Sequence, residues 1–187
     1  PKLLLPWGAT TVVGHIISQW RKLGASQIAV VLRANDLSLT VEMDRLNVPQ
    51  SDRIINPQAE RGMFSSIRCA ANWNGWHDNL DSFAIALGDQ PQLRLRMLRD
   101  LLACHSEHPD RLCQPEFEGR GRHPVLLPRR VFNELKQTTA ETFKDFLKLI
   151  PASSVQCPIN DITLSLDLDT PEDYIKAMTR FSAHEKA

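Results

Sequence analysis

The chain has 187 residues, of which 42% are hydrophobic and 24% are charged. This length supports one sizeable core but not two ordinary domains. Lys plus Arg and Asp plus Glu number 22 each, so no net charge favours a nucleic acid or an anionic membrane as partner. No apolar run approaches the length of a membrane span and no signal peptide opens the chain, so we expect a cytoplasmic protein.

Short apolar runs alternate with segments of helical spacing along the chain. In chain order, the pattern predicts helices over about 10–23, 36–46, 61–73, 90–108, 128–135, 140–149 and from 171 onward. Between them it predicts strands over 28–32, 53–55, 83–87, 112–117, 123–127 and 155–159. This alternation indicates a doubly wound α/β fold.

The run from Phe83 to Leu87 leads directly into Gly88 and Asp89. A short continuous apolar run is typical of a strand buried on both faces, and a carboxylate at its carboxyl end lies where open α/β sheets bind ligands. Gly88 would let a ligand approach the backbone closely. The alternative is a simple strand-to-helix turn with Asp89 as a cap.

Two further segments suggest anion binding. Gly62, Ser65 and Ser66 open a predicted helix, whose first N–H groups form a ready anion site, although a plain serine-capped helix is the alternative. Arg120 and Arg122 lie with two glycines in a hairpin-like loop that would suit a phosphate, or would equally be a solvated turn.

Two further groups of residues carry side chains that can bind metals. Thr170 and Pro171 form a clear helix start, which leaves the acids Asp167 and Asp169 at the end of an extended segment unexplained. The four cysteines show no framework spacing, so we expect reduced thiols. A zinc site built from Cys104, His105, His108 and Cys113 is not favoured, because the spacing fits no standard ligand pattern.

Four motifs in this order resemble one known family. They are Lys2-Leu3-Leu4-Leu5-Pro6-Trp7-Gly8, Gly62-Met63-Phe64-Ser65-Ser66, Leu87-Gly88-Asp89-Gln90-Pro91 and Asp167-Leu168-Asp169-Thr170-Pro171-Glu172-Asp173-Tyr174. Together they resemble the MobA-like nucleotidyltransferases, most closely the molybdenum cofactor cytidylyltransferase branch. The resemblance implies a Rossmann-like, three-layer nucleotide-diphospho-sugar transferase fold with a mostly parallel sheet. It also implies Mg²⁺-dependent transfer of a nucleotidyl group from CTP or another NTP to a phosphorylated acceptor such as molybdopterin, with release of pyrophosphate.

The resemblance also assigns roles to residues. Lys2 corresponds to the lysine that contacts the triphosphate, Asp89 to the metal-binding aspartate, and Asp167 with Asp169 to an acidic pair of which either member could reach the metal. The nucleotide-binding set is Lys2, Gly62, Ser65, Ser66 and Gly88. The acceptor-binding set is Arg120, Arg122 and His123, in a motif where the glycine and arginine before His123 are exchanged.

The first part of the family's pattern has no counterpart here, since its opening strand and glycine-rich loop would precede Pro1. We therefore expect residues 1–187 to form a single domain that lacks this strand, with an open slot beside the strand of Gly88 and Asp89 or a strand borrowed from another copy. Transfer to a sugar or other small phosphate, a non-catalytic nucleotide-binding protein, and a homo-oligomer are the open alternatives.

Overall fold

The computed structural model describes residues 1–150, 154–166 and 168–184. Its helices are α1 (Val12–Lys22), α2 (Leu37–Arg45), α3 (Met63–Asn72), α4 (Leu95–Glu107), α5 (Arg129–Glu134), α6 (Phe143–Leu149) and α7 (Pro171–His184). Its strands are β1 (Pro6–Trp7), β2 (Thr10–Thr11), β3 (Val30–Arg33), β4 (Arg53–Asn56), β5 (Ser82–Ile85), β6 (Leu112–Phe117), β7 (Arg120–Gly121), β8 (Val125–Pro128) and β9 (Ser154–Pro158). Short 3-10 turns cover Lys2–Leu4, Gln50–Asp52, Ala59–Arg61 and Ile162–Ser165.

The central sheet has the strand order β5-β8-β6, and β6 also pairs with β7 and β9. Strand β8 is antiparallel to both β5 and β6, and β9 is parallel to β6, so β5, β6 and β9 share one direction. Strands β3 and β4 form a separate parallel pair. The predicted α/β class with a mostly parallel sheet is confirmed, and β8 and β7 are the strands that run against it.

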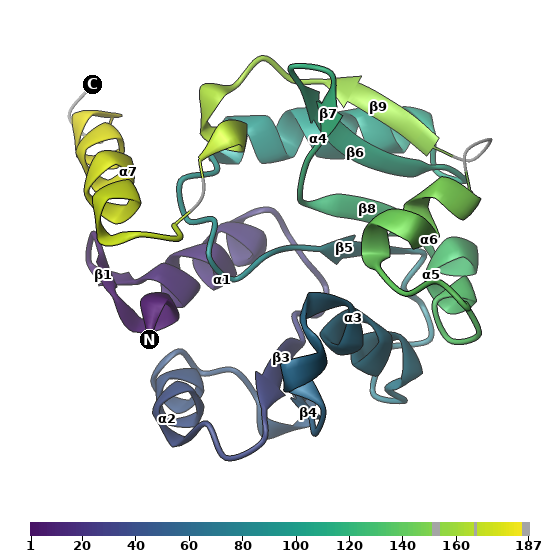
Figure 1. Ribbon diagram of the computed structural model, residues 1–187, viewed down its shortest axis with the longest axis horizontal. Helices are drawn as coiled ribbons and strands as arrows, with labels where there is room; N and C mark the ends of the chain where they lie inside the picture. The colour runs from purple at the N-terminus through teal and green to yellow at the C-terminus, as the bar shows by residue number, and fades with distance from the viewer. Residues whose placement is uncertain (151–153, 167, 185–187) are drawn as a thin grey trace.

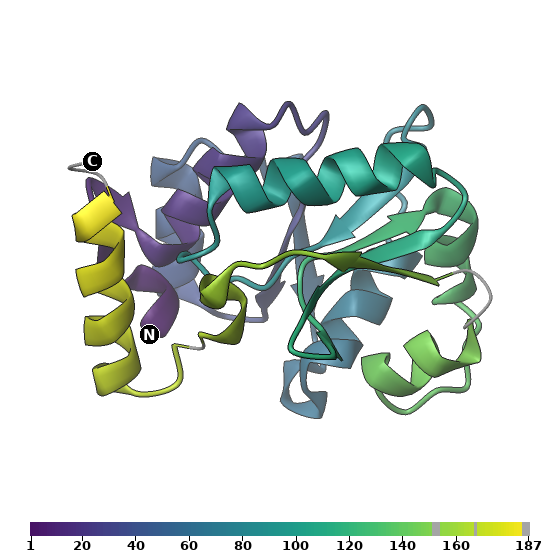
Figure 2. The same cartoon turned by 90° about the horizontal axis from the view of Figure 1, so that it is seen from above.

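Helices cover both faces of this sheet, which makes three layers (Figure 2). Along β8, Val125 and Leu127 pack in one cluster with residues of α3, α5 and α6, whereas Leu126 packs in another with residues of α4. Because side chains alternate across a strand, one apolar run supplies both cores. Fully burying each such side chain stabilises the fold by about 1.5–3 kcal/mol.

The two ends of the chain meet beside α1, where α7 lies next to β1 (Figure 1). Trp7 is completely buried there, with its ring centroid 5.0 Å from that of Phe181 and 6.3 Å from that of Tyr174. These three aromatic residues fix the N-terminal segment against α7. That contact brings Lys2 into the part of the molecule where Asp169 lies.

Strand β5 differs from its prediction in two ways. It ends at Ile85 rather than Leu87, and only Phe83 is buried whereas Ala84 is exposed. The reason is that β5 is an edge strand: within the described residues it pairs with β8 alone. The expected open slot requires an unpaired edge of this kind. That a further strand would pair with this edge stays a prediction.

The segment before Asp169 also differs from its prediction. It was expected to be extended, but Ile162–Ser165 form a 3-10 turn. Asp161 caps this turn by accepting hydrogen bonds from the backbone N–H and the hydroxyl of Thr163 at 2.9 and 2.7 Å. A side-chain cap of this kind competes with strand pairing.

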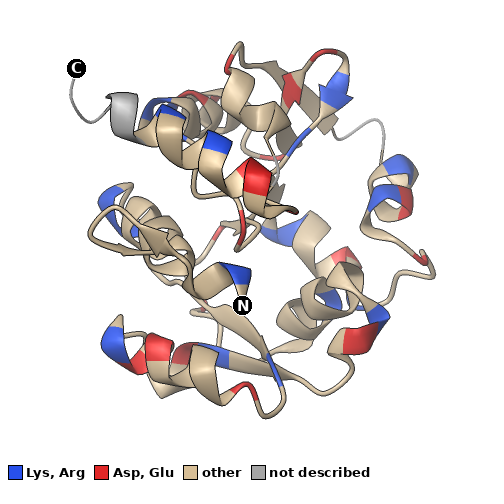
Figure 3. Cartoon of the chain, turned by 60° about the vertical axis from the view of Figure 1, so that its left-hand side comes forward, with Lys and Arg blue, Asp and Glu red and all other residues tan. Residues whose placement is uncertain are grey.

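Charges of both signs are scattered over the elements, and neither sign is confined to one side (Figure 3). This agrees with equal numbers of acidic and basic residues. Among the described residues, no helix is both long and apolar enough to cross a lipid bilayer.

Candidate active site

The central feature of the candidate site is a lysine held between two carboxylates. Lys2 Nζ lies 2.6 Å from Asp89 Oδ2 and 3.1 Å from Asp169 Oδ1. Asp89 follows the carboxyl end of β5, Asp169 precedes α7, and Lys2 begins the first 3-10 turn. Three residues that sequence reasoning assigned to one site therefore converge. Asp167, the other member of the predicted acidic pair, lies outside the described residues.

The electrostatics of this cluster favour a bound cation. Desolvation by burial lowers the pKa of Lys2, but the hydrogen bonds and charges of Asp89 and Asp169 outweigh it and raise that pKa above its usual value. The ammonium is therefore charged at neutral pH and offsets only one of the two negative charges. The Asp169 side chain is 72% exposed and that of Asp89 is 29% exposed, so water and a ligand can reach both carboxylates.

His123 is the member of the predicted acceptor set that lies near this cluster. Its Nδ1 is 3.2 Å from the carbonyl oxygen of Ile85, the last residue of β5, and the peptide bond to Pro124 is cis. Burial lowers the pKa of His123, while the carbonyl of Ile85 and the charge of Asp89 oppose that shift without cancelling it. The ring is therefore neutral at pH 7, and the charge of Asp89 acts on it.

The two arginines of the same set are placed differently. Arg120 is exposed in β7, and Arg122 donates its backbone N–H to the carbonyl of Pro115 at 2.8 Å. Within the described residues, no hydrogen bond or ion pair joins either arginine to Lys2, Asp89 or Asp169. Their acceptor-binding role stays a prediction.

The start of α3 is organised by a residue that the sequence reasoning missed. The Asn56 amide donates to Ser65 Oγ at 2.9 Å and to Ser66 Oγ at 3.0 Å, and its oxygen accepts from the N–H of Gln58 at 2.9 Å. Asn56 ends β4 and is buried. An amide at the carboxyl end of a parallel strand, directly before Pro57, is the signal that could have identified it.

Gly62 and Gly88, both predicted to bind nucleotide, have different surroundings. Gly62 caps α3 at φ 86° and ψ −176°, a conformation almost confined to glycine. At Gly88, a Cβ would lie 3.4 Å from Cδ2 of Leu3, an ordinary contact. That side of Gly88 therefore faces the side chain of Leu3, and the nucleotide-binding role of Gly88 stays a prediction.

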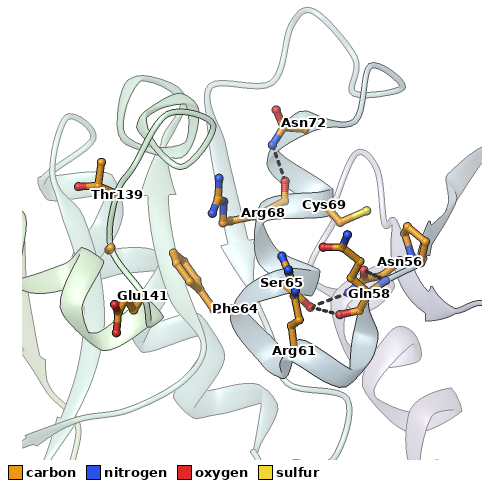
Figure 4. Close-up of a pocket in the computed structure, with 12 residues that line it drawn as sticks. Asn56, Gln58, Arg61, Phe64, Ser65, Arg68, Cys69, Asn72, Thr139 and Glu141 are labelled. Carbon is orange, nitrogen blue, oxygen red and sulfur yellow. Dashed lines mark hydrogen bonds between the residues drawn. The ribbon is translucent and has the colours of Figure 1, made fainter.

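A cleft of about 600 Å³ opens between α3 and the segment 139–141 (Figure 4). Phe64 and Arg68 project from α3 towards Thr139 and Glu141 (Figure 4). The other lining residues are Asn56, Pro57, Gln58, Arg61, Ser65, Cys69, Asn72 and Ala140. Ser65, which was predicted to bind nucleotide, therefore lines the same cleft as the two arginines Arg61 and Arg68.

The cysteines correct one expectation. Cys104 and Cys157 form a disulfide, although reduced thiols were predicted, and Cys69 and Cys113 are free. The reason is topological: β9 returns beside β6 under α4 and brings the Cα atoms of Cys104 and Cys157 to 6.3 Å. His105, a candidate zinc ligand, instead has its Nε2 2.7 Å from the hydroxyl of Ser82.

Comparison with known proteins identifies the family. The sequence profile of the MobA-like NTP transferase domain matches residues 1–154. The chain belongs to the MobA-like NTP transferase family. Its members are nucleotidyltransferase enzymes, and the family that the motifs resembled is confirmed. The molybdenum cofactor cytidylyltransferase of Escherichia coli K12 is 23% identical over 184 residues, which cover 97% of this chain and 88% of that protein.

Solved structures agree on the MobA-like fold. Rv0371c from Mycobacterium tuberculosis superposes with a TM-score of 0.73 at 26% identity, covering 96% of this chain and 89% of that one. Its complex with manganese gives a TM-score of 0.71 at 24% identity, covering 96% and 91% of the two chains. A nucleotidyl transferase from Methanothermobacter gives 0.78 at 16% identity, covering 98% and 86%. The Rossmann-like nucleotidyltransferase fold expected from the motifs is confirmed.

Proposed function

We propose that this MobA-like enzyme transfers a cytidylyl group from CTP to a phosphorylated small acceptor of the molybdopterin type and releases pyrophosphate. The observation that carries the proposal is the Lys2 ammonium between the Asp89 and Asp169 carboxylates. Phosphoryl-group transfer depends on positioning and charge neutralisation rather than on covalent chemistry by the protein, and these residues supply both. The likeness to the E. coli cytidylyltransferase supports CTP and the pterin acceptor.

The carboxylates fit a divalent cation, which we propose to be Mg²⁺. One oxygen atom of Asp89 and one of Asp169 both contact Lys2 Nζ, so the two carboxylates can contact a single cation. Mg²⁺ takes one or two carboxylates together with water and phosphate oxygens. When bound, Mg²⁺ would neutralise charge on the phosphates as pyrophosphate leaves. The solved manganese complex of the mycobacterial relative supports a divalent metal in the same fold.

The roles of the protein's own groups follow from their positions. In this proposal an oxygen of the acceptor phosphate attacks the α-phosphorus of CTP. Before this attack the Lys2 ammonium turns from the carboxylates to the triphosphate, where its positive charge offsets the negative charge that builds up as the bond to pyrophosphate breaks. Gly62, Ser65 and Ser66 hold the nucleoside beside the start of α3, and the neutral ring of His123 contacts the acceptor next to Asp89.

Asp89→Asn tests the proposal, with Asp100→Asn, an exposed acid on α4, as the control. We expect Asp89→Asn to weaken Mn²⁺ binding, which electron paramagnetic resonance measures. The same substitution should lower pyrophosphate release from CTP by about 10²–10³-fold, the typical effect of losing one group that stabilises developing charge. Normal Mn²⁺ binding and turnover in Asp89→Asn would refute the metal assignment.

Acceptor choice is tested separately with the unmodified chain. Pyrophosphate release is measured with CTP, GTP, ATP and UTP, each paired with a pterin phosphate, a sugar phosphate or a polyol phosphate. The proposal expects CTP with the pterin phosphate to be fastest. A faster sugar or polyol phosphate would select the alternative acceptor class and leave the nucleotidyltransferase assignment intact. A cytoplasmic location is a further part of the proposal, tested by fractionating cells that express the protein.

A further inference from the structure

Three sulfur atoms meet at a place that nucleotide transfer does not use. Cys104 on α4, Cys113 on β6 and Cys157 on β9 have sulfur atoms that all lie within 4.8 Å of one another. Cys113 and Cys157 are buried, and Cys104 is half-buried. A helix and two neighbouring strands thus deliver one sulfur each to a single point between the layers.

The reduced form of this cluster suits one metal ion. In the structure two of the three sulfurs are bonded to each other as the Cys104–Cys157 disulfide. Once that bond is reduced, three sulfurs placed evenly around a metal at about 2.3 Å would be about 4.0 Å apart, which is within the 4.8 Å that encloses the three sulfurs here. Within the described residues, this group contains no histidine and no carboxylate. Three sulfurs without a fourth ligand match a soft cation of low coordination number better than Zn²⁺, which prefers four ligands in structural sites.

The surroundings of the two buried sulfurs are apolar. Cys113 and Cys157 belong to an apolar cluster with Leu98, Leu101 and Leu126. Cys113 is completely buried and is not part of a disulfide, so its thiol lies beside the Cys104–Cys157 bond as a third sulfur.

We propose that reduction of the Cys104–Cys157 disulfide converts this cluster into a three-sulfur site for Cu(I). A dithiol reductant supplies the two electrons and two protons that break the S–S bond, and is itself oxidised to a cyclic disulfide. The three thiols then ligate the cation and release their protons to solvent. The disulfide and the copper site are alternative states of the same sulfurs, and both tie α4 to β9.

The test uses the reduced full chain under anaerobic conditions, titrated with Cu(I) against a chromophoric chelator. We expect one Cu(I) per chain and an X-ray absorption spectrum with sulfur as the only near neighbour. Cys113→Ser should weaken Cu(I) retention by at least about 100-fold. Cys69→Ser, which changes the other free cysteine, should leave retention unchanged.

Two further measurements test the proposal without relying on the folding of Cys113→Ser. Cys104→Ser changes the half-buried ligand, so it should fold even if Cys113→Ser does not, and it should also lose Cu(I). The oxidised chain should bind Cu(I) at least about 100-fold more weakly than the reduced chain. Equal binding by the oxidised chain, or equal loss in Cys69→Ser and Cys113→Ser, would overturn the proposal.

Discussion

Gly62 and Gly88 offer a test at the scale of single residues, because both were predicted to bind nucleotide but only one needs to be glycine. We expect Gly62→Ala to lower the free energy of unfolding by about 1–3 kcal/mol, since φ 86° with ψ −176° is strained for any other residue. Gly88→Ala should change it by less than about 0.5 kcal/mol, because its Cβ would make an ordinary contact with Leu3. Urea unfolding measures both values, and equal losses would contradict the assignment of strain.

His15 provides a pH-dependent prediction at the same scale. Burial, with a smaller effect of Lys22, lowers the pKa of His15 to about 4 from 6.5. Its Nε2 also faces the amide nitrogen of Gln19 at 2.6 Å, where only the neutral ring can accept. Below pH 6.5 the unfolded chain binds this proton and the folded chain does not, so stability falls as the pH falls from 6.5 towards 4.

Substitution of His15 isolates this effect from that of the carboxylates. Relative to the unmodified chain, His15→Gln should show a smaller loss of unfolding free energy between pH 7 and pH 5. The difference should be about 1 kcal/mol, allowing for solvent screening of a partly exposed ring. His77→Gln is the control, because that side chain is exposed. Parallel pH profiles for His15→Gln and the unmodified chain would contradict the prediction.

At the scale of elements, Asn56 connects the end of β4 to the first turn of α3. Asn56→Ala removes its hydrogen bonds to Ser65, Ser66 and Gln58 and should lower the unfolding free energy by about 1–3 kcal/mol. If α3 lines the nucleotide site, affinity for CTP measured by calorimetry should fall as well. Asn72→Ala, at the other end of α3, loses one exposed hydrogen bond and should change the unfolding free energy little. Unchanged stability in Asn56→Ala would contradict this role.

Elements with strong local signals were predictable, and contacts between distant segments were not. The helix predicted over about 10–23 is α1, and Thr11 caps it by accepting a hydrogen bond from the N–H of Gly14, a contact between neighbouring residues. The convergence of Lys2, Asp89 and Asp169 was implied by the family resemblance but by no local spacing. The burial of Trp7 under Phe181 and the Cys104–Cys157 bond depend on where α7 and β9 pack, which hydrophobic periodicity does not encode.

For the whole molecule, the contact between the two chain ends supports the candidate site. Phe181→Ala should lower the unfolding free energy by about 1–3 kcal/mol, because it removes a ring packed on Trp7 and His15. We expect Mn²⁺ affinity to fall too, since Lys2 and Asp169 are held near each other by this contact. Ile175→Ala, on the exposed side of the same helix, is the matched control. A stable Phe181→Ala chain with unchanged Mn²⁺ affinity would show that the site does not depend on the contact.

The wide sequence separation of the three charged side chains also sets the order in which their cluster can assemble during synthesis. Lys2 and Asp169, which form a hydrogen bond, are 167 positions apart. Asp89 precedes α4, β6 and β9 in the chain, whereas Asp169 follows all three. A nascent chain that has emerged only as far as β9 can therefore offer Asp89 but not Asp169 to Lys2 and to a metal, so the paired carboxylates come together only after the sheet strands have been made.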